Sequence, residues 1–214
     1  VGAGGDWNTA ANWSLISGGA GGAGIPGAAD DARFDSNSGN CTLDANASCL
    51  SINTAGFTNT IELATYDLGA VQAVTHAGGT ISIGASAANG LSIGPGGLAN
   101  TASLLCAGAS KISCAGNWAN NGSFTPGAGT VTFNGVSGMS GATNNFNNMA
   151  ITGAFTAPTG TMNVAGSFAN TGTFNHNSGT ILFNGNTLIS GTSTSTFNTI
   201  SISGTMTGPA GTLN

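Results

Sequence analysis

The stretch GNWANNGSFTPGAGTVTFNG, residues 116–135, recurs fifty residues later as GSFANTGTFNHNSGTILFNG, residues 166–185. After one inserted residue the match resumes at an offset of 51, so that Ile151 corresponds to Ile202. A weaker copy lies upstream, where GTISI at 79–83 precedes GTVTF by fifty residues. Self-similarity at a fixed period is the signature of a repeat protein. We therefore predict about three tandem repeats, over residues 66–115, 116–165 and 166–214, behind a distinct head, residues 1–65.

Apolar and polar residues alternate within each repeat. In the segment 130–133, Val131 and Phe133 share one face and the two threonines share the other. Alternation of period two, interrupted by glycine and asparagine, predicts short β-strands, and no segment has the periodicity of a helix. One such repeat cannot bury its apolar face alone, so repeats stack and share a core. We predict an all-β fold, a β-solenoid-like stack of short strands, with a β-sandwich of repeated hairpins as the alternative.

The composition excludes several kinds of partner. Only 2 basic and 7 acidic residues occur among 214, which leaves too few cations to bind nucleic acid or an anionic membrane surface. No apolar run approaches the roughly 18 residues that a membrane span requires. Apolar residues still make up 40% of the chain, enough to form a core. The 37 glycines are therefore interpreted as turn residues between strands.

The head differs from the repeats in charge and in aromatic residues. All seven carboxylates precede Leu68, and the sequence carries Trp7 and Trp13 close to its beginning. We expect the two tryptophans to pack over the first coil, and a sugar-stacking site is the alternative. A calcium site using Asp30, Asp31 or Asp35 is a further alternative to the favoured interpretation of these acids as turn-forming or solvated side chains.

Four cysteines form two close pairs with the same spacing of eight residues, Cys41 with Cys49 and Cys106 with Cys114. Each pair brackets an expected turn, so we predict two local disulfides and hence an oxidising compartment. The alternative is that all four are small apolar core residues, because free cysteine is often buried. A zinc site is disfavoured, since there is no CxxC motif and the histidines lie far away in the sequence.

No constellation of residues predicts catalysis. The repeats contain no carboxylate pair, and the adjacent Asp30 and Asp31 would point to opposite faces of a strand. His76 and His176 lie 100 residues apart, or two repeats, and are expected at equivalent positions too distant to share a metal ion. The glycine-rich stretches lack the Lys-Ser/Thr ending of a phosphate loop. We predict that the protein is not an enzyme and has no cofactor.

The last residues, Gly211, Thr212, Leu213 and Asn214, stop where the preceding repeat continues into another strand. Solenoids usually need a cap, and an uncapped end exposes strand edges that recruit another chain. We expect these four residues to form an assembly edge, covered either by further chain or by the next subunit of a head-to-tail filament.

Several segments carry a family resemblance. The pairs DWN at 6–8 and NWS at 12–14, then PGAADDARF at 26–34 and CTLD at 41–44, resemble the opening of large bacterial secreted and surface β-repeat proteins. The units at 116–135 and 166–185 resemble the tandem repeats of the same autotransporter-passenger-like or adhesin-like proteins. The resemblance covers most of the chain. It implies a secreted protein that serves as an adhesin, a sheath or matrix component, or a passenger domain.

These observations together predict a structural subunit of an extracellular filament, sheath or surface layer, whose partners are copies of itself. The alternative function is an adhesin or passenger fragment that binds carbohydrate or a host surface. Glycans are a second expected class of partner, since N-x-S/T sequences begin at Asn12, Asn40, Asn46 and Asn121. Ice binding is disfavoured, because T-x-T spacing occurs only in places, such as 130–132 and 192–196.

Overall fold

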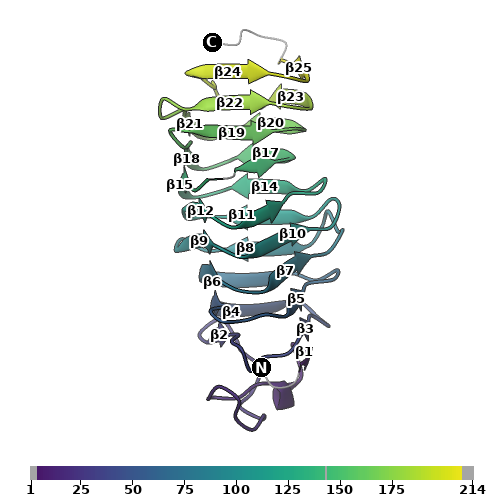
Figure 1. The fold of residues 1–214 in the computed structure, drawn as a ribbon. Coiled ribbons are helices and arrows are strands. Elements are labelled where there is room, and N and C mark those ends of the chain that lie inside the picture. Colours follow the sequence, from purple (N-terminus) through teal and green to yellow (C-terminus); the bar gives the residue numbers. More distant parts are fainter. Residues whose placement is uncertain (1–3, 143, 209–214) are drawn as a thin grey trace.

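The computed structural model describes residues 4–142 and 144–208, which form an all-β solenoid of about nine turns. The coils stack into a rod, with the head at one end and the last strands at the other (Figure 1). Within these ranges the only helical element is the short 3-10 helix η1 (Ala10–Asn12) in the head. All strand pairs in the described part of the chain are parallel, for example β11 with β14. The alternative of a β-sandwich built from hairpins is therefore wrong, because hairpin strands pair antiparallel.

Three strands make one turn, because each strand in the body of the rod pairs with the strand three places later in the chain. The first of the three faces, the β7 face, is a six-stranded sheet. Its strands are β1 (Gly5–Asp6), β3 (Cys41–Thr42), β5 (Thr60–Glu62), β7 (Thr80–Ile83), β10 (Ser103–Cys106) and β13 (Ser123–Thr125). In the upper coils, a second sheet of four strands takes the same position in the chain order of each turn. Its strands are β16 (Asn145–Phe146), β19 (Thr161–Val164), β22 (Thr180–Phe183) and β24 (Thr199–Ile202).

The other two faces meet at the long strand β6 (Leu68–His76), which pairs with β8 through its first residues and with β9 through its last. The β8 face contains the first residues of β4 (Ala47–Asn53), then β8 (Gly90–Ile93), β11 (Lys111–Cys114), β14 (Thr130–Phe133), β17 (Asn148–Ile151), β20 (Ser167–Asn170), β23 (Asn186–Ser190) and β25 (Thr205–Thr207). The β9 face contains β2 (Asp31–Arg33) and the last residues of β4, then β9 (Gly97–Asn100), β12 (Trp118–Asn120), β15 (Val136–Ser140), β18 (Ala154–Thr156) and β21 (Thr173–Asn175).

The core consists of rows of inward-pointing side chains that run along the rod axis. Period-two alternation turns Val131 and Phe133 inward, where both are buried, while Thr130 and Thr132 face outward. Because neighbouring strands pair in register, each inward-pointing apolar side chain stacks on the inward-pointing apolar side chain of the next coil. One such row on the β8 face is buried at every position: Leu68, Leu91, Ile112, Val131, Met149, Phe168 and Ile189.

The fifty-residue sequence repeat does not correspond to a whole number of coils. Paired positions from β2 onward lie 18 to 24 residues apart, as in Val131 with Met149 and Val74 with Leu98. Trp118 on β12 and Phe168 on β20, which are equivalent in the repeat, are separated by eight strands, or two and two-thirds turns. Equivalent residues therefore occupy the same environment on neighbouring faces. The strand ladders also continue across the expected boundary at residue 65, because β4 pairs with β6 and β5 with β7.

Candidate functional site

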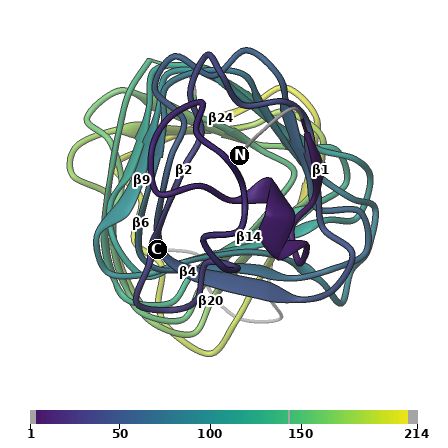
Figure 2. The ribbon, with the colours of Figure 1, turned by 90° about the horizontal axis from the view of Figure 1, so that it is seen from below.

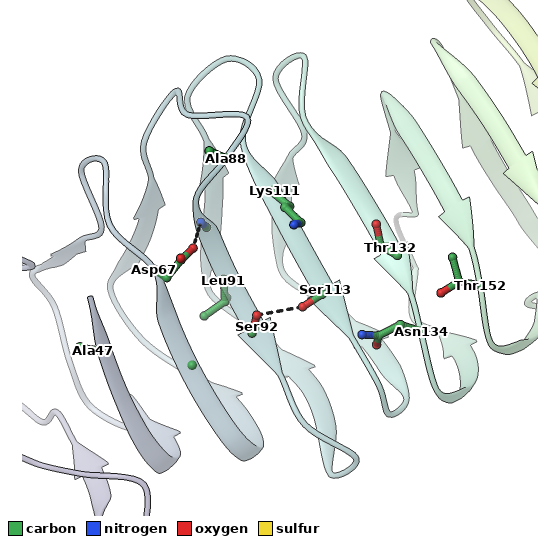
Figure 3. Close-up of a pocket in the computed structure, with 12 residues that line it drawn as sticks. Ala47, Asp67, Ala88, Leu91, Ser92, Lys111, Ser113, Thr132, Asn134 and Thr152 are labelled. Carbon is green, nitrogen blue, oxygen red and sulfur yellow. Dashed lines mark hydrogen bonds between the residues drawn. The ribbon is translucent and has the colours of Figure 1, made fainter. Parts of the chain in front are cut away.

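A groove of about 570 Å³ lies on the outer surface of the β8 face, where it crosses β6, β8, β11 and β14 (Figure 3). Its hollow comes from side chains that are absent or small at Gly69, Gly90 and Ser92. A Cβ atom at Gly90 would lie 1.8 Å from the carbonyl oxygen of Lys111, so glycine is required at that position. The groove is lined by Ala47, Asp67, Gly69, Ala88, Gly90, Leu91, Ser92, Lys111, Ser113, Thr132, Asn134 and Thr152.

Most of the polar groups in the groove are available to a ligand. Ser113 Oγ donates to Ser92 Oγ at 2.9 Å, and the Asp67 carboxylate accepts from the Gly90 N–H at 2.8 Å (Figure 3). The side chains of Lys111, Thr132 and Asn134 form no hydrogen bond with the described part of the chain. Lys111 is the only charged residue after Asp67 in the sequence. The groove thus offers hydroxyls, an amide, one cation and the Asp67 carboxylate, which already accepts hydrogen bonds from the Gly90 N–H and from Asn89.

The acids that the sequence analysis considered as calcium ligands each have a separate structural role. Asp30 accepts from the Gly27 N–H at 2.9 Å, and Asp31 accepts from the Ser51 hydroxyl. Asp35 accepts from Ser38 and from the Asn37 N–H, and its pKa is lowered, first by a side-chain hydrogen bond with Ser17 and then by the Asn37 bond. Within residues 4–142 and 144–208 no three metal-ligating side chains gather into a cluster.

The prediction of two disulfides is wrong. Cys41, Cys49, Cys106 and Cys114 are free thiols at inward-pointing core positions. The spacing of eight places the two members of each pair on different strands, on either side of a turn of the coil, and not opposite each other in a ladder. Burial raises the pKa of Cys41, Cys49 and Cys106 to about 12 and that of Cys114 to about 11. The thiols therefore stay protonated inside the core, where Cys114 Sγ donates to the Gly116 carbonyl oxygen at 3.3 Å, and the disulfide argument for an oxidising compartment no longer holds.

Trp7 and Trp13 close the amino end of the core. Their rings pack edge to face with centroids 4.8 Å apart, and Trp13 packs in the same way on Phe34 at 5.7 Å. Trp13 Nε1 donates to the Trp7 carbonyl oxygen at 2.7 Å. Both rings are buried, Trp7 completely and Trp13 with 5% exposed. They are not available to stack on a sugar.

At the opposite end, the last described coil leaves apolar side chains exposed. Phe183 is fully buried, but Ile202, which pairs with it one coil later, is 49% exposed. Ile181 and its partner Ile200 show the same contrast, with 3% and 37% exposed. Among the described residues β24 pairs only with β22, so the other edge of β24 has no partner strand. The expected assembly edge, Gly211 to Asn214, lies outside the described residues.

A buried polar ladder at one corner of the rod was missed by the sequence analysis. His76 pairs with Asn100 and Asn100 with Asn120, and all three are almost fully buried. His76 Nδ1 lies 2.9 Å from the Thr54 hydroxyl, and Nε2 donates to the Ser103 carbonyl oxygen at 2.9 Å. Asn100 Nδ2 donates to Asn120 Oδ1 at 2.7 Å. Recurrence of a polar residue one coil length apart is the only sequence signal of this ladder.

The expectation that His76 and His176 occupy equivalent sites is also wrong. His76 ends a nine-residue strand and is buried in the ladder, whereas His176 follows β21 at a partly exposed turn. There His176 Nδ1 accepts from the Ser178 N–H at 3.0 Å. Burial lowers the pKa of His76, and its hydrogen bond with Ser103 opposes that shift.

No helix within the described ranges has the length and apolar character to span a membrane. No family model, no curated protein and no solved structure matches this chain. The resemblance to bacterial secreted β-repeat proteins therefore remains a hypothesis drawn from the residues quoted above.

Proposed function

We propose that the protein is a non-enzymatic structural subunit of an extracellular filament, sheath or surface layer, and that copies of it associate end to end. The observation that carries the proposal is the difference between the two ends of the rod. Aromatic rings seal the amino end, while the last described coil leaves Ile200 and Ile202 exposed beside an unpaired strand edge. Exposed edges and apolar ends of this kind recruit further chains.

The charge distribution supports the same proposal. From Leu68 onward the chain carries one charged residue, Lys111, so the upper part of the rod presents little electrostatic repulsion to a neighbour. Localisation at the cell surface or outside the cell is part of the proposal and rests on the composition and on the family resemblance.

Sedimentation velocity of the whole chain tests the proposal. We expect concentration-dependent association by the native chain, and its loss in the double variant Ile200→Ser/Ile202→Ser. Val136→Ser is the matched control, because Val136 is 82% exposed on the side of the rod, away from both ends. Association that persists in the double variant would contradict the proposal, as would a native chain that stays monomeric at all concentrations.

A second candidate function, an adhesin that binds carbohydrate, is favoured by the groove. Hydroxyl and amide groups line it, and Lys111, Thr132 and Asn134 have hydrogen-bonding capacity to spare. In a glycan array we expect binding that is lost in Lys111→Met/Thr132→Val and retained in Thr173→Val, an exposed threonine of the β9 face. An array without signal for the native chain would eliminate this candidate.

A further inference from the structure

A second hollow adjoins the groove on the outside of the β8 face. It has a volume of about 380 Å³ and lies over the turns that lead into β8, β11 and β14, where it is lined by the small side chains of Ala87, Ala109 and Ala128. Lys111 and Thr132 line both the groove and this hollow. The two spaces therefore meet at Lys111, which projects from the middle of the strand array (Figure 3).

The groove runs along the rod and not around it. Gly69, Ser92, Ser113 and Thr132 are register partners in four successive coils. The lining extends from β4 to the turn after β17, which is five steps between coils, or about 24 Å at roughly 4.8 Å per step. Viewed down the rod axis, β14 and β20 lie on one side of the coil, so the groove follows that side (Figure 2). A site of this length fits a chain-like ligand that lies parallel to the axis and is longer than a single sugar unit.

Lys111 gives the groove a positive charge that forms no ion pair and no hydrogen bond within the described part of the chain. Its side chain is exposed, and its register partner Gly90, one coil below, has no side chain to cover it. The Asp67 carboxylate, one coil further down, is held by the Gly90 N–H at 2.8 Å and by Asn89 Nδ2 at 3.1 Å. Because Lys111 is the only charged residue after Asp67, the groove beyond β8 attracts a negatively charged group.

The lining also selects among chain-like anions. None of the described residues that line the groove or the second hollow is aromatic, so neither a neutral glycan nor the bases of a single-stranded nucleic acid would find a ring to stack on. An extended peptide adds to a sheet through a free strand edge, but β6, β8, β11 and β14 are each paired on both sides. Sugar hydroxyls need only polar side chains, and these surround the cation.

We propose that the groove and the second hollow form one binding site for an anionic polysaccharide, whose carboxylate or sulfate group binds Lys111. The hydroxyls of the polysaccharide bind the polar side chains beside Lys111, namely Thr130, Thr132 and Asn134, which form no side-chain hydrogen bond within the described residues. Carboxylate and sulfate share the chemistry that Lys111 recognises, a negatively charged oxygen that accepts from an ammonium group. This inference rests on the second candidate function, carbohydrate binding, and names the class of glycan.

Isothermal titration calorimetry of the whole chain tests the inference with polygalacturonate, dextran sulfate, neutral dextran and polyglutamate as probes. We expect binding of at least one acidic polysaccharide, weaker at about 0.5 M than at about 0.05 M salt, and no binding of dextran or polyglutamate. Lys111→Met should raise the Kd about tenfold through loss of one charge-assisted hydrogen bond, and Lys111→Arg should retain binding. Arg33→Met is the matched control, because it removes the other cation of the chain, outside the groove and the second hollow, and should leave the Kd unchanged.

The outcomes separate the inference from the candidate function beneath it. A preference for polygalacturonate or for dextran sulfate supports the inference and identifies the acidic group as carboxylate or sulfate. Equal loss of affinity in Lys111→Met and Arg33→Met would overturn it, because overall charge would then govern binding. Polyglutamate that binds as tightly as the acidic polysaccharides would also overturn it. Dextran binding that Lys111→Met does not weaken would refute the anionic ligand and leave carbohydrate binding intact, whereas a chain that binds no polysaccharide would refute both.

Discussion

Stacked coils approach each other so closely at the corners that a single added methyl group should measurably lower the free energy of unfolding. Gly141 has φ of +106°, and a Cβ atom built there would lie 1.9 Å from the carbonyl oxygen of Asn120 in the coil below. Gly22 in the head has the same φ of +106°, but a Cβ atom there meets nothing within 4 Å. The pair Gly141→Ala and Gly22→Ala therefore separates steric overlap between coils from the backbone strain that both share.

Both substitutions bear the cost of a positive φ, about 1–3 kcal/mol, and both gain about 0.4–1 kcal/mol from the stiffer unfolded chain. Only Gly141→Ala must also move the backbone of the neighbouring coil, an overpacking cost of about 1–3 kcal/mol. With an m-value of about 2 kcal/mol/M in urea, we expect its midpoint about 1 M below that of Gly22→Ala.

Tryptophan fluorescence in a urea titration measures this difference, since Trp118 pairs with Met139 two residues before Gly141. Gly191→Ala should behave like Gly141→Ala, because Gly191 has φ of +113° and its Cβ atom would lie 1.9 Å from the Asn170 carbonyl oxygen. Equal midpoints for Gly141→Ala and Gly22→Ala would refute the close stacking of coils.

Three further predictions concern buried polar groups. Burial keeps the pKa of His76 below the ordinary value of 6.5, so below about pH 6.5 the unfolded chain binds more protons than the native protein and the free energy of unfolding should decrease. His76→Gln should flatten this pH dependence of the urea midpoint, and a slope equal to that of the native chain would contradict the prediction. A thiol reagent at pH 8 should modify none of the four buried thiols in the native protein and all four in urea. An unfolded chain without reactive thiols would show that the cysteines form disulfides. Asn100→Ala should cost about 1–3 kcal/mol in chemical denaturation because it leaves the Ser123 carbonyl oxygen and Asn120 with fewer partners, whereas Asn134→Ala, at an exposed side chain, should change stability by less than about 0.5 kcal/mol.

Sequence reasoning identified the strand faces because alternation is a local property. Val131, Phe133, Met162 and Val164 all point inward, as the period-two pattern of their segments predicts. The same reasoning could not give the length of a coil. The fifty-residue repeat places equivalent side chains in similar environments, but on different faces of the three-sided coil. The repeat alone therefore does not reveal that its period spans two and two-thirds turns.

The errors on individual residues have one physical cause, which is that register is not local. Cys106 and Cys114 are close in the sequence, but whether their sulfurs face each other depends on the turn between their strands. His76 and His176 share a repeat position, yet the upstream copy contains the nine-residue strand β6 and so places His76 differently. The groove required knowledge of which outward residues align across coils, as Ser92 aligns with Ser113 and Ser113 with Thr132.

End-to-end association of rods is the central claim, and electron microscopy of the native chain at concentrations where it associates tests it most directly. About nine coils at roughly 4.8 Å each give a stacked length near 43 Å, to which the head adds. We predict unbranched filaments one rod in width, with an axial repeat of roughly 45–50 Å. Discrete rods at every concentration and salt condition, or sheets formed by contact between the sides of the rods, would contradict the claim.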